Sequence, residues 1–545
     1  MQETGSLIDA FEAMVAEGPG RRAVAWGESE ESLTYAELDE RSARVAGSLA
    51  ELGVRRGGCV AVWLPNVPEW LVLELACARL GAMIAPLNTR YRSAEATHLL
   101  RMSEATVAVV PLGFMSIDFL SILADALGAA LPAGEPTSEH LPDLRHIVTV
   151  DLFDEPESGD LPEACIPFER LEAGPAERRR GDASSPLNLF VTSGTTGPPK
   201  LAVHDQGSVT GRFQEAGRRA GVVGGDALLC ALPLCGVWGV GVAVLALTRG
   251  ATCVLLPTFD PEACVRLIER WGVTHVHGSD GMLRAILEEP GADAASLSTW
   301  RGGNFGNFTG RPGEELVELA RRTADITLGG AYGSSEGLAM IGLWLPDDDA
   351  RLRGLAGGNL IGEGTEVRAC DPESGEVLDH EIPGELHVRG PSVMTHYLNN
   401  PDATAQAFSD DGWFKTGDLG YTMPENRIIF LSRLKDSLRL RGFLVDPQEI
   451  EEHLAKHPEV RLAQVVGVDG PRGQLAVAFV QRTPTSELDG ATLRAFCRER
   501  IADFKVPARI EFVEEFPVTD GPNGVKIQKF ALRERAAALV EDGDG

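Results

Sequence analysis

The chain has 545 residues, of which 43% are hydrophobic and 24% are charged, so it is globular in composition and too long for one hydrophobic core. Its formal net charge of −30 argues against nucleic-acid and anionic-membrane partners. Nine cysteines lack paired or metal-type spacing, and the N-terminus lacks a basic segment and a long apolar run. These features predict a cytoplasmic protein with reduced thiols, no signal peptide and no membrane span.

The first part of the chain alternates helical and strand patterns. Thr34 and Glu37 have the spacing of a capping box and predict the start of a helix. Residues 60–64 and 106–110 are short apolar runs typical of buried strands. This rhythm predicts mostly parallel sheets with helices on both faces. Residues 130–185 are rich in Pro, Glu, Asp and Gly, and we expect an irregular surface excursion there.

Residues 192–204 read TSGTTGPPKLAVH and stand between the β-prone runs 187–191 and 201–203. The pattern predicts strand, turn, strand, because Gly, Ser and Pro interrupt apolar runs that are too short for helices. Two glycines allow backbone N–H groups to converge, and hydroxyls and Lys200 add donors, so the loop suits phosphate oxygens. It is not a P-loop, since Pro199 precedes the lysine and no helix can start there.

Ser193 to Lys200 match the signature Ser-Gly-Thr-Thr-Gly-x-Pro-Lys. Here the chain resembles the adenylate-forming (ANL) superfamily, which contains AMP-binding acyl-CoA synthetases, standalone acid-adenylating enzymes and luciferases. The resemblance implies that one group of residues binds the phosphates of ATP: Thr192, Ser193, Gly194, Thr195, Thr196, Gly197 and Lys200.

Two later segments resemble the superfamily's other nucleotide motifs. Residues 332–336 read YGSSE, similar to Tyr-Gly-x-Thr-Glu, where the aromatic ring lies on adenine, the hydroxyl meets phosphate and the carboxylate holds Mg²⁺. Thr416-Gly417-Asp418 resembles the segment whose carboxylate accepts both ribose hydroxyls. The implied ATP-binding residues are Tyr332, Gly333, Ser334, Ser335 and Asp418, with Glu336 as catalytic residue and metal ligand.

The pattern of expected helices and strands changes near Leu434. This change predicts a large N-terminal domain, 1–434, and a small α/β domain, 435–545, joined by a short hinge. Residues 431–436, LSRLKD, resemble the family hinge, with Arg433 reaching ribose or phosphate and Lys435 as the catalytic pivot. Near the end, a Lys-Ile-x-Lys frame resembles the catalytic segment and implies that Lys526 bridges the carboxylate and the α-phosphate. We expect Lys529 to belong to a solvated basic tail.

The acid pocket is expected from three segments, 232–239, 275–282 and 302–308. Asp280 either holds a polar group of the acid or caps the helix that starts near Met282. The polar character of the third segment favours a cyclic, aromatic or functionalised acid over a long plain chain. The predicted pocket residues are Cys235, Gly236, Trp238, Asp280, Asn304 and Gly330.

The resemblance implies an acid–thiol ligase that uses Mg²⁺-ATP to form an acyl-adenylate and then a thioester with CoA. An alternative is an adenylating ligase that transfers to a separate carrier protein or an amine, or that activates nitrite for diazotisation. A third interpretation, a non-catalytic nucleotide-binding regulator, is disfavoured by Glu336, Asp418 and Lys526. We expect a monomer or a homodimer.

Overall fold

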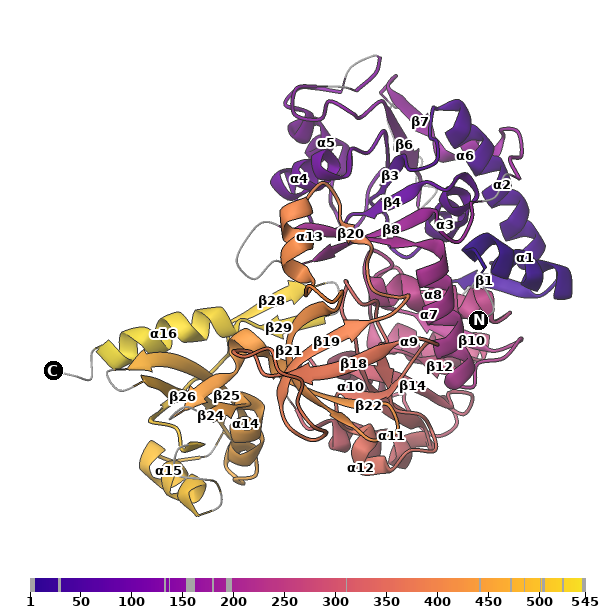
Figure 1. Ribbon diagram of the computed structural model, residues 1–545. Helices are drawn as coiled ribbons and strands as arrows, with labels where there is room; N and C mark the ends of the chain where they lie inside the picture. Colours follow the sequence, from indigo (N-terminus) through magenta and orange to yellow (C-terminus); the bar gives the residue numbers. More distant parts are fainter. Residues whose placement is uncertain are drawn as a thin grey trace.

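The computed structural model describes the chain apart from residues 1–4, 28–30, 132–133, 137, 153–161, 179–180, 193–198, 310, 441–442, 471–472, 485, 500, 502–504, 522–523 and 542–545. Figure 1 shows a large body built from the N-terminal part and a smaller C-terminal unit, coloured orange to yellow. Strands and helices alternate through both. The predicted α/β class, with mixed parallel sheets, is confirmed.

One sheet has the strand order β20-β9-β8-β4-β3-β5-β6-β7. Its inner pairs are parallel, whereas β8 and β9 pair antiparallel, as the strand–turn–strand pattern predicts. The strands are β3 (Cys59–Val62), β4 (Met83–Pro86), β5 (Val107–Pro111), β6 (His146–Val150), β7 (Cys165–Pro167), β8 (Pro186–Thr192), β9 (Lys200–Asp205) and β20 (His396–Tyr397).

The second sheet has a parallel half and an antiparallel half. In the parallel half the order is β1-β11-β10-β12-β14-β15, with β2 at the edge and β13 beside β14. These strands are β1 (Arg22–Trp26), β2 (Ser32–Thr34), β10 (Ala227–Cys230), β11 (Thr252–Leu255), β12 (His275–Val276), β13 (Gly278–Ser279), β14 (Gly302–Gly306) and β15 (Thr327–Tyr332).

Strand β15 continues into the antiparallel half, whose order is β15-β16-β17-β22-β21-β19-β18. The further strands are β16 (Gly342–Leu343), β17 (Gly357–Leu360), β18 (Glu366–Cys370), β19 (Gly384–Arg389), β21 (Phe414–Met423) and β22 (Arg427–Arg433). One continuous strand therefore links two types of sheet.

The helices of the large body cover these sheets. Helix α8 is apolar all round and nearly all of it is buried, which is typical of a helix enclosed on every side. The helices are α1 (Leu7–Glu17), α2 (Tyr35–Glu51), α3 (Pro68–Leu80), α4 (Ser93–Ser103), α5 (Phe119–Leu127), α6 (Phe168–Glu172), α7 (Gln206–Arg219), α8 (Val237–Thr248), α9 (Pro261–Trp271), α10 (Asp280–Leu287), α11 (Gly313–Ala324), α12 (Ala350–Arg353) and α13 (Pro401–Ala407).

The C-terminal unit has hydrophobic clusters of its own, one of them centred on Val465, Ala478 and Leu493. Strand β25 pairs antiparallel with β26, and β27 adds in parallel. Its elements are the 3₁₀ turn η1 (Leu434–Asp436), β23 (Leu438–Leu440), β24 (Phe443–Val445), α14 (Pro447–Ala455), β25 (Val460–Gly470), β26 (Gly473–Arg482), α15 (Gly490–Arg498), β27 (Arg509–Phe512), β28 (Val518–Gly521), β29 (Gly524–Ile527) and α16 (Lys529–Glu541).

Two local expectations have different outcomes. The capping box at α2 is confirmed, because Thr34 Oγ1 accepts from the Glu37 N–H at 3.2 Å while the Glu37 carboxylate accepts from the Thr34 N–H at 2.7 Å. The irregular excursion predicted for 130–185 is wrong in part, since β6 and β7 extend the first sheet there. The run His146–Val150 is β-branched and buried, and this local signal outweighs the polar composition around it.

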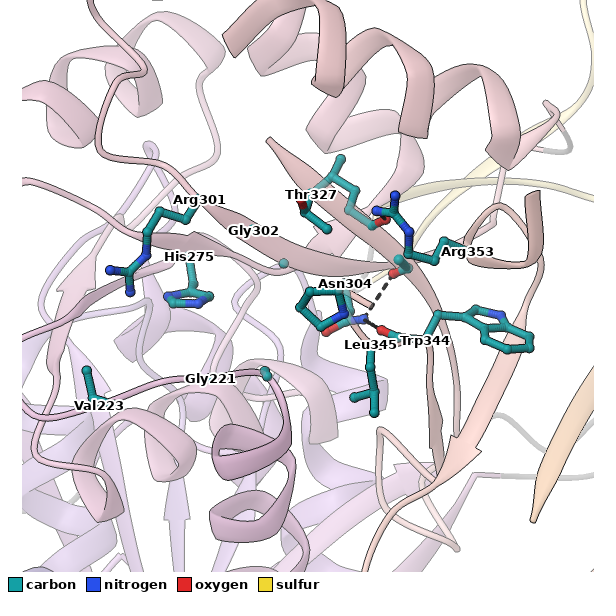
Figure 2. A pocket seen from close by; sticks show the side chains of 15 residues that line it. Gly221, Val223, His275, Arg301, Gly302, Asn304, Thr327, Trp344, Leu345 and Arg353 are labelled. Carbon is teal, nitrogen blue, oxygen red and sulfur yellow. Dashed lines mark hydrogen bonds between the residues drawn. The ribbon is translucent and has the colours of Figure 1, made fainter. Parts of the chain in front are cut away.

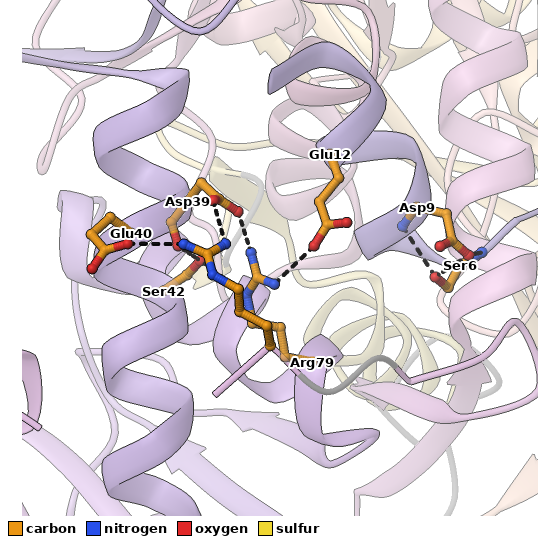
Figure 3. A network of polar contacts seen from close by, with 8 residues as sticks. Ser6, Asp9, Glu12, Asp39, Glu40, Ser42 and Arg79 are labelled. Atoms are coloured by element: carbon orange, nitrogen blue, oxygen red, sulfur yellow. Dashed lines mark hydrogen bonds and ion pairs between the residues drawn. The ribbon is translucent and has the colours of Figure 1, made fainter. Parts of the chain in front are cut away.

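A buried ion network ties the first three helices together (Figure 3). Arg79 on α3 is fully buried, and it bonds Asp39 on α2 and Glu12 on α1, the latter at 3.0 Å. Arg178 reaches the other oxygen of Asp39 at 2.8 Å. The guanidinium is paired on both sides, which is the condition under which a buried charge is tolerated.

Helix α3 also buries a carboxyl group, Glu74, which is fully enclosed. The Asn188 amide nitrogen on β8 lies 3.1 Å from each of its oxygens. Burial raises the pKa of Glu74 to about 8, and the hydrogen bond from Asn188 opposes this only weakly. The carboxyl is therefore protonated in the folded protein at neutral pH, whereas in the unfolded chain it ionises near its ordinary pKa of 4.5.

Stability should fall as pH rises from about 4.5 to about 8, because unfolding releases the Glu74 proton across this range. We expect Glu74→Gln, which has no proton to lose, to raise the apparent Tm at pH 8 by roughly 2 °C or more. The gain should shrink at pH 5. Thermal melts at both pH values measure it, with Glu51→Gln on the exposed end of α2 as control. An equal effect at both pH values would contradict the assignment.

Candidate active site

A cavity of about 510 Å³ lies at the carboxyl ends of β14 and β15. Its walls come from the end of β8, the start of α8, the segment after β15, and strands β21 and β22. Crevices at the carboxyl ends of parallel strands are the usual ligand sites of open α/β sheets. The cavity brings together residues from positions 86 to 433 of the chain.

The predicted phosphate loop joins β8 to β9, where Thr192 and Lys200 are paired opposite each other. Ser193, Gly194, Thr195, Thr196 and Gly197 lie outside the described residues. The Thr192 hydroxyl is buried and has no hydrogen-bond partner within the described part of the chain. The Lys200 ammonium lies 4.3 Å from the centre of the Tyr397 ring, a cation–π contact.

Two aromatic rings and one carboxylate form the side of the cavity next to the antiparallel strands. Tyr332 and Phe430 stack with ring centres 5.4 Å apart. The Tyr332 hydroxyl donates to Asp418 Oδ2 at 2.7 Å, and Arg433 Nη1 lies 3.0 Å from Oδ1. The register of β21 and β22 pairs Asp418 directly with Arg433, which explains the contact.

Asp418 is only 2% exposed, so its ionisation depends on these partners. Burial raises its pKa to about 6, while the Arg433 guanidinium and the Tyr332 hydroxyl act in the opposite direction. The carboxylate is therefore charged at neutral pH and can accept hydrogen bonds from two neighbouring hydroxyls.

Residues 333–336 follow β15 and are fixed against β9. The His204 imidazole lies 2.8 Å from the Ser335 carbonyl, and burial lowers the pKa of His204 to about 4. The ring is therefore neutral and donates its Nε2 hydrogen to that carbonyl. Ser334 and Ser335 both line the cavity, as does Gly333.

Glu336 has a partner that the sequence did not indicate. The Tyr397 hydroxyl on β20 donates to Glu336 Oε1 at 2.9 Å, and the Glu336 carbonyl accepts from Met394 N–H at 2.7 Å. The second carboxylate oxygen has no hydrogen bond to any described residue. Within the described ranges no three His, Cys, Asp or Glu side chains gather as a metal site. One carboxylate with a free oxygen fits Mg²⁺, which takes its other ligands from phosphates and water.

The inner part of the cavity contains three of the predicted pocket residues, Cys235, Gly236 and Trp238. Asn88 and Tyr91, which the prediction does not include, also line it, as do Asn307 and Phe308 of the predicted segment 302–308. Tyr91 and Asn88 lie far from every motif in the sequence, so no local signal marks them. At Gly306 a Cβ atom would come within 2.7 Å of the Phe308 ring, so close ring packing excludes larger residues there.

Three predicted pocket residues do not line this cavity. Asp280 is fully buried and accepts a hydrogen bond from the backbone N–H of Phe308 at 2.9 Å. Its carboxylate therefore holds the loop after β14 in place. Asn304 donates to two backbone carbonyls and faces a different cavity. Gly330 packs against the Leu355 carbonyl, only 2.0 Å from where a Cβ would stand.

The two predicted catalytic lysines lie in the C-terminal part. Lys435 lies within η1, the turn that directly follows Arg433. Burial lowers the pKa of Lys435, although the neighbouring Asp436 carboxylate acts in the opposite direction. Lys526 lies on β29, opposite Thr519 of β28. Lys529 is not a free tail residue as expected, because its ammonium lies 2.8 Å from the buried carboxylate of Glu451.

Within the described part of the chain, none of the helices combines the length and the apolar character that a bilayer crossing requires.

The sequence matches the AMP-binding enzyme family over residues 11–398 and the AMP-binding enzyme C-terminal domain over residues 449–520. It is 30% identical to 4-coumarate–CoA ligase 1 of Oryza sativa subsp. japonica, with 94% of this chain and 88% of the relative covered. ATP-bound MatB from Rhodopseudomonas palustris superposes with a TM-score of 0.82 at 26% identity, covering 98% and 99% of the two chains. The amide bond synthetase McbA from Marinactinospora thermotolerans gives 0.79 at 28% identity, covering 97% and 99%.

The chain therefore belongs to the family of AMP-binding enzymes, and its resemblance to the adenylate-forming superfamily is confirmed. It is an ATP-binding, AMP-forming acid–thiol ligase of the acyl-CoA synthetase type.

The contact between Tyr397 and Glu336 can be tested by removing one oxygen. Tyr397→Phe keeps the ring beside Lys200 but removes the hydroxyl that orients the carboxylate. We expect adenylate formation to fall about tenfold and the Mg²⁺ concentration for half-maximal rate to rise, as happens when a partner of a metal ligand is lost. Pyrophosphate exchange at varied Mg²⁺ measures both.

Tyr421→Phe on β21, outside the cavity, is the matched control and should leave both quantities unchanged. Wild-type rate and Mg²⁺ dependence in Tyr397→Phe would show that Tyr397 does not position Glu336.

Proposed function

We propose that this enzyme activates a compact cyclic or aromatic carboxylic acid in the 510 Å³ cavity and transfers it to CoA. The observation that carries the proposal is the composition of the cavity. One end holds the paired Asp418 and Arg433 beside Tyr332, and the other is walled by Trp238 and Phe308. A nucleotide and an acid would thus meet in one enclosed space.

At the nucleotide end, Asp418 would accept the ribose hydroxyls, and Tyr332 and Phe430 would pack against the base. Lys200 and the loop before it would hold the phosphates, with Ser335 as a further donor. Glu336 would hold Mg²⁺, whose charge offsets that of the leaving pyrophosphate.

At the acid end, three aromatic rings favour a planar or cyclic substrate, since rings pack in offset or edge-to-face geometry: Tyr91, Trp238 and Phe308. The amides Asn88 and Asn307 would meet a polar substituent. Part of the cavity is needed by the nucleotide, so the acid has only the remainder. We therefore expect a long plain chain to fit poorly.

We further propose that the domains divide at Leu434 and that Lys435 is the pivot between adenylation and thioester formation. The 3₁₀ turn Leu434–Asp436 is short and charged, and the elements after it have their own hydrophobic clusters. In the first step Lys526 would bridge the carboxylate and the α-phosphate and stabilise the charge that develops there. Cytoplasmic location and a monomer or homodimer remain predictions.

Product analysis tests the acceptor and the acid together. The protein is incubated with Mg²⁺-ATP and aryl, alicyclic, β-amino and fatty acids, with and without CoA, and products are identified by mass. We expect AMP, pyrophosphate and a CoA thioester, with kcat/KM highest for a compact cyclic or aromatic acid. A preference for long fatty acids would contradict the proposed substrate class. AMP without any thioester would indicate that the acyl group goes to a carrier protein or to an amine instead of CoA. The structural neighbour McbA is named an amide bond synthetase.

Two single substitutions, compared with each other, distinguish the roles of Lys526 and Lys529. Lys526→Ala should reduce adenylate formation at least about a hundredfold, because a preorganised cation at the reacting oxygen is lost. Lys529→Ala should lower the apparent Tm by leaving Glu451 unpaired, with adenylation within about threefold of wild type. Pyrophosphate exchange and thermal melts are measured on both. The reverse pattern would assign catalysis to Lys529.

A further inference from the structure

A second cavity of about 300 Å³ lies between β14, β15 and the end of α7 (Figure 2). Gly302 and Asn304 of β14 line it, together with Thr327 and Gly329 of β15. No described residue lines both this cavity and the 510 Å³ cavity of the proposed active site. The two spaces are separate, and both take lining residues from β14 and from β15.

The register of the two strands shows which residues share the face on which the Asn304 side chain lies. Asn304 pairs in parallel with Gly329, and side chains alternate between faces along each strand. Residues 302, 304 and 306 of β14 thus share a face with 327, 329 and 331 of β15. The earlier positions line the small cavity, whereas Gly306 and Ala331 line the large one. From residue 304 to residue 306 the distance along the strand is about 7 Å.

Along this shared face of β14 and β15 the side chains are small, apart from Asn304. Its neighbours on the face are Gly302, Gly306, Gly329 and Ala331, with Thr327 at the far end. Asn304 lines the small cavity, comes two positions before Gly306 of the large one, and is only 4% exposed. Apart from Asn304, the two strands project no side chain larger than threonine from this face. Trp344 covers the face at Gly329, and the Phe308 and Trp238 rings cover it at Gly306.

Two hydrogen bonds hold the Asn304 side chain across the shared face. The Asn304 amide nitrogen donates to the carbonyls of Gly329 and Trp344, each at 3.1 Å. Figure 2 shows the amide lying between the strand and the segment that carries Trp344 and Leu345. Trp344 is itself fixed, since its indole N–H donates to the Leu355 carbonyl at 3.0 Å. The amide therefore bridges two fixed carbonyls and cannot swing aside without losing both bonds.

We propose that Asn304 closes the inner end of the acid pocket and is the residue that limits the length of the acid. This inference rests on the proposed function, because it assumes that the acid lies beside Gly306 and Ala331. A shorter side chain at position 304 would join the two cavities along β14 and β15 and lengthen the pocket by about 7 Å.

The test measures kcat/KM for straight-chain acids from butanoic to dodecanoic acid, through AMP release with Mg²⁺-ATP and CoA. Wild type should lose activity sharply as the chain lengthens. Asn304→Ala should raise kcat/KM for decanoic acid at least about tenfold while that for butanoic acid stays within about threefold. Asn304→Ser, which keeps a hydroxyl for the Gly329 carbonyl, serves if the alanine variant does not fold.

Two controls distinguish a steric effect of the Asn304 side chain from a general loss of packing. Asn304→Leu keeps the volume and loses the hydrogen bonds, so it should still exclude decanoic acid. Asn359→Ala on β17 removes another amide side chain, which is half-buried and donates to the Leu343 carbonyl at 3.2 Å. This control should leave the dependence of kcat/KM on chain length unchanged. Folded alanine and serine variants with the wild-type profile would overturn the inference, as would an equal shift in Asn359→Ala. If wild type makes no AMP from these acids or from the aryl and alicyclic acids of the product analysis, the proposed function fails instead.

Discussion

Strand β15 pairs in parallel with β14 on one side and antiparallel with β16 on the other, and both halves of the site depend on this. Its carboxyl end carries Ala331 towards the acid end of the cavity and Tyr332 towards Asp418. Because one rigid strand positions both, an acid and a nucleotide would meet with little reorganisation. The energetic gain from such fixed proximity is large, since the entropy of bringing two reactants together is already lost.

The electrostatics of the cavity contrast with those of the whole chain. A protein with a formal charge of −30 repels polyanions at long range, yet ATP is one. In the proposed site, local cations would offset this repulsion, since Arg433 lies beside Asp418 and Lys200 lies over the Tyr397 ring. Arg433 keeps a buried carboxylate ionised, and that carboxylate in turn fixes the guanidinium at the cavity wall. Pairing of this kind is what allows charged groups to remain in a buried site.

The sequence motifs predicted which residues meet around Asp418 better than which residues line the rest of the cavity. Tyr332, Asp418 and Arg433 stand in short motifs, and the structure brings these three into contact although 101 positions separate the first from the last. Asn304 stands in a segment whose end lines the cavity, whereas no residue of Asp280's segment, 275–282, lines it. Both side chains bond backbone partners instead. Which face of a strand or helix a polar side chain occupies follows from register, and register was not visible in the motif.

Linear patterns in the sequence correctly predicted the α/β class and the strand–turn–strand arrangement around residues 192–200, and they supplied the motifs from which nucleotide binding is proposed. These depend on local patterns: apolar periodicity, turn residues and short spacings that a chain carries in linear order. Tertiary structure was needed to show that the Tyr397 hydroxyl bonds Glu336, that Tyr91 lines the cavity, and that Asn304 bonds the Trp344 carbonyl. Each of these contacts joins elements that are distant in the chain, and strand order and register alone bring them together.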